Sequence, residues 1–194
     1  MAKLPHRSAS PATESTLRII GGLHRGRKLP IPELSGLRPT ADRTRETLFN
    51  WLQFDIVDMT VLDLFAGTGA LGLEALSRGA QSAIFVEPQA RAAEGIVRSL
   101  ETLALPQGSV QRMMAQQFLT TTEQRFDLIF VDPPFSADLW SVTLEGLLAA
   151  NILTERGYIY LECPQSQAID IPAPWATVKD KTAGNVRIRL LAGH

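Results

Sequence analysis

The residues Asp132-Pro133-Pro134-Phe135, which follow the apolar stretch FDLIFV, have the types needed to hold an amino group for methylation. The exocyclic amino nitrogen of a purine is a weak nucleophile because its lone pair is delocalised into the ring. Two acceptors on its N–H bonds, the Asp132 carboxylate and the Pro133 carbonyl, can offset the positive charge that develops during attack. Phe135 offers a ring on which a base can stack. We expect Asp132, Pro133 and Phe135 to be catalytic; a turn without function is the alternative.

A glycine-rich stretch, Asp63 to Gly72, likewise follows a short apolar run. Gly67 and Gly69 allow conformations and close approach that a Cβ forbids, so a cofactor can lie directly on the main chain. The G-x-G-x-x-G spacing also fits a nicotinamide dinucleotide, and a turn that only serves packing is a further alternative. Asp63 favours S-adenosylmethionine, because this carboxylate would repel a pyrophosphate and attract the cationic amino and sulfonium groups.

Two further strand exits complete the expected cofactor site. Glu87 follows the run SAIFV and precedes a proline, where its carboxylate can accept hydrogen bonds from both ribose hydroxyls. An exposed loop carboxylate without a role is the alternative. Ala115 and Gln116 follow the next expected strand, and we place them against the adenine on position alone.

The elements that must position these residues are short apolar runs that alternate with helical segments from residue 60 onward. This alternation predicts an α/β fold with a mostly parallel, doubly wound sheet. The last two runs, joined through 182–185, should form an antiparallel edge. The seven expected strands are TVLDLF (60–65), SAIFVE (82–87), SVQRMM (109–114), FDLIFVD (126–132), GYIYLEC (157–163), WATVKD (175–180) and VRIRLLA (186–192).

The N-terminal part differs from the rest in charge. Residues 1–50 carry nine Lys or Arg against four Asp or Glu, whereas residues 51–194 carry ten against sixteen. We expect a disordered tail over 1–16, a basic extension over 17–59 and the sheet domain over 60–194. The extension should hold a β-hairpin, in which the turn GGLHRG joins the strands LRII and RKLPI. A helix should follow, which Thr40 can cap and which buries Leu48, Phe49 and Leu52. Its basic residues are candidates for binding RNA, with a merely solvated charged face as the alternative. They are Arg18, Arg25, Arg27, Lys28 and Arg43.

Size and composition set the remaining bounds. A chain of 194 residues with 45% hydrophobic content can bury one sizeable core. The single Cys163 cannot form an internal disulfide, and three scattered histidines do not make a metal cluster, so we expect no metal. The longest apolar runs are too short to span a membrane, and we expect a soluble, cytoplasmic protein.

The motifs taken together resemble a known family. DPPF is similar to the catalytic motif of amino-directed N-methyltransferases, and DLFAGTGALGLEALSRGA is similar to their cofactor motif. With LRIIGGLHRGRKL and RPTADRTRETLFNWL in the same order, residues 17 to about 192 resemble the bacterial 16S ribosomal RNA guanine-N2-methyltransferase family RsmD. No family motif is recognised over 163–184.

The resemblance implies a Rossmann-like class I fold that uses S-adenosylmethionine, with a guanine N2 in 16S ribosomal RNA of the small ribosomal subunit as target. It places the cofactor at Asp63, Ala66, Gly67, Gly69 and Glu87, and catalysis at Asp132, Pro133 and Phe135. The segment Arg38-Pro39-Thr40, with Asp42 and Arg43, resembles a family signature in which Arg43 could help to close the cofactor pocket. A surface arginine paired with Glu46 or Thr47 is the alternative.

Two other functions remain open. An adenine-N6-methyltransferase acting on RNA or DNA would use the same chemistry, although the DNA enzymes usually need an added recognition domain for which this chain has no room. A catalytically inactive methyltransferase fold that binds RNA as an assembly factor is the alternative outside enzymes. The intact DPPF motif and glycine loop argue against it.

Overall fold

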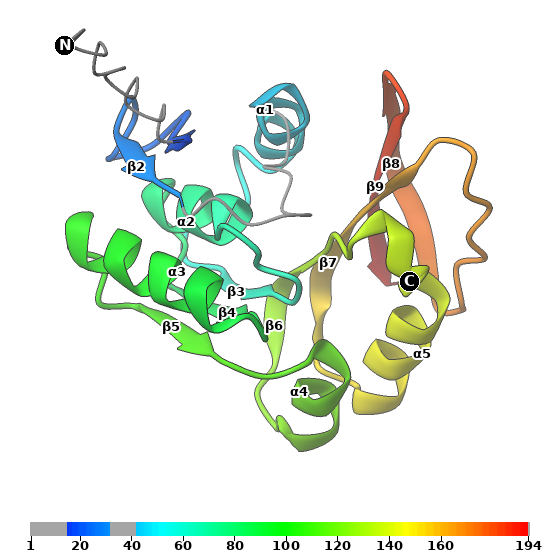
Figure 1. The fold of residues 1–194 in the computed structure, drawn as a ribbon. Coiled ribbons are helices and arrows are strands. Elements are labelled where there is room, and N and C mark those ends of the chain that lie inside the picture. The colour runs from blue at the N-terminus through cyan, green and yellow to red at the C-terminus, as the bar shows by residue number, and fades with distance from the viewer. Residues whose placement is uncertain (1–14, 32–41, 194) are drawn as a thin grey trace, which may run out of the picture.

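The computed structural model of the chain describes residues 15–31 and 42–193, which form a seven-stranded sheet with helices on both faces and a small N-terminal hairpin (Figure 1). The sheet has the order β5-β4-β3-β6-β7-β9-β8. Strands β3 to β7 pair in parallel, and β9 pairs antiparallel with both β7 and β8. The expected α/β, mostly parallel and doubly wound architecture with an antiparallel edge is therefore confirmed.

The observed strands of this sheet match the expected ones in number and order but not always in length. They are β3 Thr60–Asp63, β4 Ser82–Val86, β5 Gly108–Gln111, β6 Phe126–Val131, β7 Leu153–Pro164, β8 Trp175–Ala183 and β9 Val186–Gly193. The prediction that the third strand runs to Met114 is wrong, because pairing with β4 ends at Gln111. β7 begins four residues earlier than expected, because Leu153 already pairs with Phe126 of β6.

Five α-helices of the described residues surround the sheet. They are α1 Asp42–Trp51, α2 Ala70–Ser77, α3 Ala90–Thr102, α4 Ala115–Thr121 and α5 Trp140–Ala150, and a 3-10 turn covers Phe135–Ala137. One core cluster joins α1, α2 and α3 to one face of the sheet, and a second joins α4 and α5 to the other. β6 is buried along both faces, as is typical of a central parallel strand.

The N-terminal hairpin consists of β1 Thr16–Arg18 and β2 Lys28–Pro30, paired antiparallel as expected. Strand β1 includes Thr16, which the expected tail over 1–16 contained, and residues 1–14 lie outside the described residues. Leu17 and Leu29 of the hairpin belong to the same core cluster as α2, and Figure 1 shows the hairpin beside that helix. α1 buries Leu48, Phe49 and Leu52 as expected, whereas Thr40 lies outside the described residues.

None of the helices in the described ranges combines the length and the apolar character needed to cross a membrane.

Candidate active site

The glycine loop that follows Asp63, Glu87 and the turn that begins at Asp132 meet at one edge of the sheet. β3 lies between β4 and β6 and runs parallel to both, so Asp63, Glu87 and Asp132 all stand at the carboxyl ends of neighbouring strands. Ligands of open α/β sheets bind at this edge, where the loops leave the strands. The expected cofactor and catalytic residues therefore share one site.

The glycine loop between β3 and α2 has two distinct requirements for glycine. Gly69, the residue before α2, has a φ of 77°, which side chains rarely adopt. A Cβ on Gly72, in the first turn of α2, would lie 2.3 Å from the Phe85 ring, so this glycine lets the helix pack closely on β4. The third glycine of the G-x-G-x-x-G spacing thus serves helix packing.

Asp63 lies beneath this loop rather than open to solvent. It is 2% exposed, and its Oδ2 accepts the main-chain N–H of Gly72 at 2.9 Å. The pKa of Asp63 is raised to about 7, mainly by burial and to a smaller extent by the charge of Glu87, against the lowering effect of the Gly72 hydrogen bond. A cation placed above the loop would favour the ionised form of Asp63.

Glu87 is also buried, at 5% exposure, and ties the loop to the end of β4. Its Oε2 accepts the N–H of Gly67 at 2.9 Å, and its Oε1 accepts the N–H of Gln89 at 2.8 Å. Burial raises the pKa of Glu87, and these two hydrogen bonds lower it. Each oxygen keeps a further lone pair, so this carboxylate can accept further hydrogen bonds while also shaping the loop.

The other expected cofactor residues fall at the same edge. Ala66 is buried and donates its N–H to the Val86 carbonyl at 3.0 Å. Because β5 ends at Gln111, Ala115 and Gln116 are in the first turn of α4 and not directly at a strand exit. Ala115 is buried, and Gln116 is half-buried.

Asp132 and the residues after it leave β6 in a short turn. Asp132 is half-buried, Pro133 is buried, and Phe135 is 39% exposed at the start of the 3-10 turn. The Phe135 ring lies against the buried Trp140 of α5, with ring centroids 5.8 Å apart. Trp140 therefore braces the Phe135 ring while part of Phe135 stays exposed, as a ring on which a base could stack must be.

Two polar residues beside this turn were missed in the sequence. Tyr160 and Glu162 lie on β7, and the Tyr160 hydroxyl donates to Glu162 Oε2 at 2.5 Å. Burial raises the pKa of Tyr160 well above its ordinary value, and the charges of Glu162 and Asp132 add to this. Burial also raises the pKa of Glu162. A glutamate within the very apolar run GYIYLEC was the signal that could have found this pair.

Most of the described basic side chains of the N-terminal extension are exposed, and one, Arg45, is buried. Arg25, Arg27 and Lys28 of the hairpin are exposed, as are Arg18 and Arg43. Arg18 Nη2 lies 3.8 Å from Asp42 Oδ2. Arg43 is at the surface of α1, and its carbonyl accepts the Thr47 hydroxyl at 3.0 Å. Arg38, Pro39 and Thr40 lie outside the described residues.

A buried ionic cluster, also missed, fastens the extension to α2. The fully buried Glu74 accepts the N–H groups of Ile20 at 2.8 Å and Gly21 at 2.7 Å, and Arg78 Nε donates to it at 2.8 Å. Arg45, 1% exposed, donates to the Arg18 carbonyl at 3.0 Å. Arg45 is therefore a structural arginine. A charged residue in the middle of the otherwise apolar helix sequence ALGLEALS was the available signal for Glu74.

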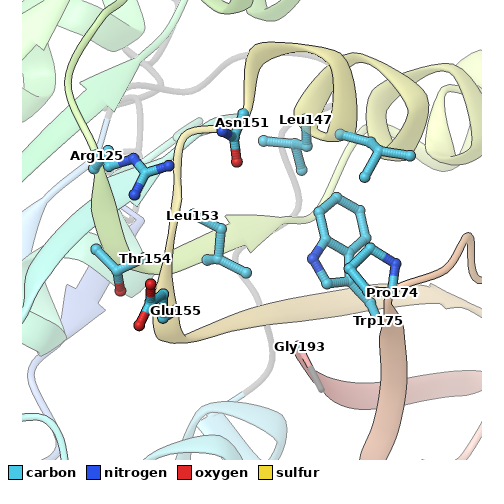
Figure 2. A pocket seen from close by; sticks show the side chains of 10 residues that line it. Arg125, Leu147, Asn151, Leu153, Thr154, Glu155, Pro174, Trp175 and Gly193 are labelled. Carbon is cyan, nitrogen blue, oxygen red and sulfur yellow. The ribbon is translucent and has the colours of Figure 1, made fainter.

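A hollow of about 570 Å³ lies elsewhere, with Arg125, Asn151, Thr154 and Trp175 among its lining residues (Figure 2). Arg125 precedes β6 and Trp175 begins β8, so this hollow is at the end of the sheet opposite Asp132. Among the described residues, no group of three or more His, Cys, Asp or Glu side chains is placed to hold a metal ion.

Comparison with known proteins gives consistent matches over nearly the whole chain. The model of the family described as "Conserved hypothetical protein 95" matches residues 17–192. The chain is 43% identical over 189 residues to ribosomal RNA small subunit methyltransferase D of Escherichia coli K12. The aligned region covers 97% of this chain and 93% of that protein. It is 40% identical over 185 residues to the protein of the same name from Haemophilus influenzae, covering 93% and 96% of the two chains.

Solved structures agree with these matches. A putative methyltransferase from Escherichia coli superimposes with a TM-score of 0.86 at 40% identity, covering 93% of this chain and 99% of that one. A putative methylase from Haemophilus influenzae has a TM-score of 0.81 at 38% identity, covering 92% and 99%. The expected methyltransferase fold is confirmed.

Proposed function

Because this chain belongs to the ribosomal RNA small subunit methyltransferase D (RsmD) family, we propose that it methylates the exocyclic N2 amino group of a guanine in 16S ribosomal RNA, using S-adenosylmethionine. The observation that carries the proposal is the meeting of the glycine loop, Glu87 and the Asp132 turn at one edge of the sheet. The relatives named for ribosomal RNA support the substrate class, and the amino-directed DPPF motif supports the nitrogen target.

S-adenosylmethionine supplies an electrophilic methyl group on a sulfonium centre. In this proposal the loop of Ala66, Gly67 and Gly69 holds it, with the Asp63 carboxylate below to attract its positive charge. Glu87 accepts hydrogen bonds from the ribose hydroxyls, and Ala115 and Gln116 of α4 lie toward the adenine. Asp63 acts through the loop, because its Oδ2 already accepts the Gly72 N–H.

The Asp132 turn presents the nucleophile. The target base leaves its stack, and Phe135, braced by Trp140, holds the ring. The Asp132 carboxylate and the Pro133 carbonyl accept hydrogen bonds from the two N–H groups of the amino nitrogen. They thereby align this nitrogen with the methyl carbon and the sulfur. No strong base is needed before attack, because the proton becomes acidic only once the nitrogen is methylated. Asp132 then accepts this proton or passes it to water.

The exposed basic residues of the hairpin and α1 bind RNA phosphates. Such contacts position the substrate without selecting its base. The cluster around Glu74 supports this role, since it holds the hairpin against the helix that begins at the glycine loop. The candidates are Arg18, Arg25, Arg27, Lys28 and Arg43.

The proposal is tested by incubating the protein with labelled donor and undermethylated small ribosomal subunits, followed by digestion to nucleosides. We expect label in N2-methylguanosine. Label in N6-methyladenosine would replace the guanine assignment by the adenine one. Binding of S-adenosylmethionine, measured by titration calorimetry, separates both enzymes from an inactive assembly factor, which would bind RNA without the donor. Naked 16S RNA in a parallel reaction tells whether the assembled subunit is required.

A further inference from the structure

Glu162 is a carboxylate that the proposed chemistry leaves unused, although it stands beside Asp132. β6 and β7 pair in parallel with Val131 opposite Leu161, so the next residue of each strand, Asp132 and Glu162, reaches the same edge of the sheet. Side chains alternate along a strand and neighbouring strands are about 4.8 Å apart. Asp132 and Glu162 are therefore neighbours on the same face.

Two aromatic residues hold Glu162 in relation to the rest of the site. The Tyr160 hydroxyl donates to Glu162 Oε2 at 2.5 Å and also interacts with the charge of Asp132. Trp140 Nε1 donates to the Glu162 carbonyl at 2.7 Å, and the same indole lies against Phe135. Glu162 is thus held by two side chains, one of which lies near the Asp132 carboxylate and the other against the Phe135 ring.

One oxygen of Glu162 has a donor and the other does not. The residue is 5% exposed, and Oε2 accepts from Tyr160. Within the described part of the chain, no hydrogen-bond donor reaches Oε1. Oε1 is not among the buried side-chain atoms without a partner in this part of the chain, so it is open to solvent, and a donor of the substrate can reach it beside Asp132. A donor at Oε1 would also favour the ionised carboxylate.

We propose that Glu162 accepts the N1–H of the target guanine and thereby selects guanine over adenine. This inference rests on the proposed function, in which Asp132 and Pro133 hold the adjacent N2 amino group. The Watson–Crick edge of guanine places the N1–H donor next to its amino group, whereas adenine places a lone pair on N1 next to its own. An ionised carboxylate has only acceptors, so it pairs with the first edge and repels the second.

The test uses two RNA substrates that carry guanine or 2-aminopurine at the target position. 2-Aminopurine keeps the 2-amino group but has a lone pair on N1 in place of the N1–H. We expect the wild-type protein to prefer guanine by about 10- to 100-fold in kcat/KM, the effect of one charge-assisted hydrogen bond. Glu162→Gln, whose amide nitrogen can donate to an N1 lone pair, should reduce this ratio at least about tenfold.

A matched control separates specificity from packing. Tyr160→Phe removes the hydroxyl that donates to Glu162 but keeps the carboxylate and the ring that packs edge-on against Phe130. Its rate on guanine should fall, and its ratio between the two substrates should fall less than that of Glu162→Gln, because the carboxylate itself remains. Thermal unfolding of each variant checks that it is folded.

The outcomes distinguish this inference from the function on which it rests. A folded Glu162→Gln variant that methylates guanine with the wild-type ratio would overturn the inference and leave the function intact. A wild-type ratio near one would overturn it without any variant, even if Glu162→Gln failed to fold. If the wild-type protein methylated the 2-amino group of neither substrate, the proposed function itself would fail.

Discussion

Glu87 accepts the main-chain N–H of Gly67 at 2.9 Å, and this contact links the expected ribose acceptor to the glycine loop. The second carboxylate oxygen accepts the Gln89 N–H. The side chain that should bind the cofactor is therefore also a structural part of the loop on which the cofactor should lie, and a change at this position has two effects.

Glu87→Ala should weaken the binding of S-adenosylmethionine by about 10- to 100-fold, the loss of charge-assisted hydrogen bonds worth about 1.5 to 3 kcal/mol. It should also lower the thermal unfolding midpoint, because the buried N–H groups of Gly67 and Gln89 lose their acceptor. Calorimetric titration measures the first effect. Glu94→Ala, on the exposed side of α3, is the matched control and should change neither quantity. An unchanged dissociation constant for Glu87→Ala would remove Glu87 from the cofactor site.

The affinity for S-adenosylmethionine should depend on pH through Asp63, whose pKa burial raises to about 7. A cationic ligand prefers the ionised carboxylate, so the dissociation constant should rise roughly tenfold from pH 8 to pH 6, and binding should release protons near pH 7. Asp63→Asn keeps an oxygen for the Gly72 N–H and should flatten this profile. An equally steep profile in that variant would assign the titration to another group.

The same carboxyl makes a prediction for the unliganded protein. The pKa of Asp63 in the folded state lies above the ordinary aspartate value of about 3.9, so the folded chain binds more protons than the unfolded chain between about pH 4 and pH 7. The contribution of Asp63 to the free energy of unfolding is therefore present at the acidic end of this window and is lost as the pH rises through 7. Urea unfolding of wild type and Asp63→Asn across this range checks the sign.

Asp132→Ala should abolish methyl transfer while the binding of S-adenosylmethionine survives, because Asp132 holds the nucleophile. Asp132→Asn keeps an acceptor oxygen without the charge, so partial activity would indicate that alignment matters more than charge compensation. Phe135→Ala should mainly harm placement of the base, since stacking contributes about 1 to 3 kcal/mol. Single-turnover rates on the RNA substrate distinguish these effects. Turnover by Asp132→Ala at the wild-type rate would contradict this mechanism.

Reversal of Arg25, Arg27 and Lys28 to Glu should raise the KM for RNA and leave cofactor affinity unchanged, because these side chains are exposed on the hairpin. Loss of phosphate contacts should also flatten the dependence of log affinity on log salt by about 0.7 to 0.9 per contact. Reversal of Arg125, Arg156 and Lys179, which are exposed elsewhere, is the control. Equal salt slopes in the hairpin variant and the wild type would show that these residues are a solvated charged surface that does not contact phosphates.

Glu74→Gln should destabilise the protein by about 3 to 5 kcal/mol, the typical effect of removing one partner from a buried charge pair. Arg78 would lose its carboxylate partner, Arg45 would keep Asp42 but lose the more distant charge of Glu74, and the N–H groups of Ile20 and Gly21 would lose charged acceptors. Urea unfolding measures the change, with Glu101→Gln on the exposed side of α3 as the control. A loss below about 1 kcal/mol would show that the cluster adds little to the docking of the hairpin.

The sequence by itself was sufficient to predict the number of strands and their succession along the chain, the glycine loop and the turn after Asp132. These are local properties: an apolar run predicts a strand, a glycine pair predicts a special turn, and Asp132-Pro133-Pro134-Phe135 is contiguous. The parallel sheet then brings Asp63, Glu87 and Asp132 together, because all three follow strands of the same direction. Strand ends were less well predicted, since Leu153 and Gln111 mark limits that depend on pairing with a neighbour.

Only the tertiary structure decided which polar residues are partners across elements. Glu74 meets Ile20 and Gly21 from more than fifty positions earlier in the chain. Arg45 is buried in the same cluster, although it lies within the extension that was expected to be basic. Glu162 stands beside Asp132 only because β7 pairs with β6 in one particular register. Such contacts depend on the packing and register of distant segments, which leave no periodic pattern in the sequence.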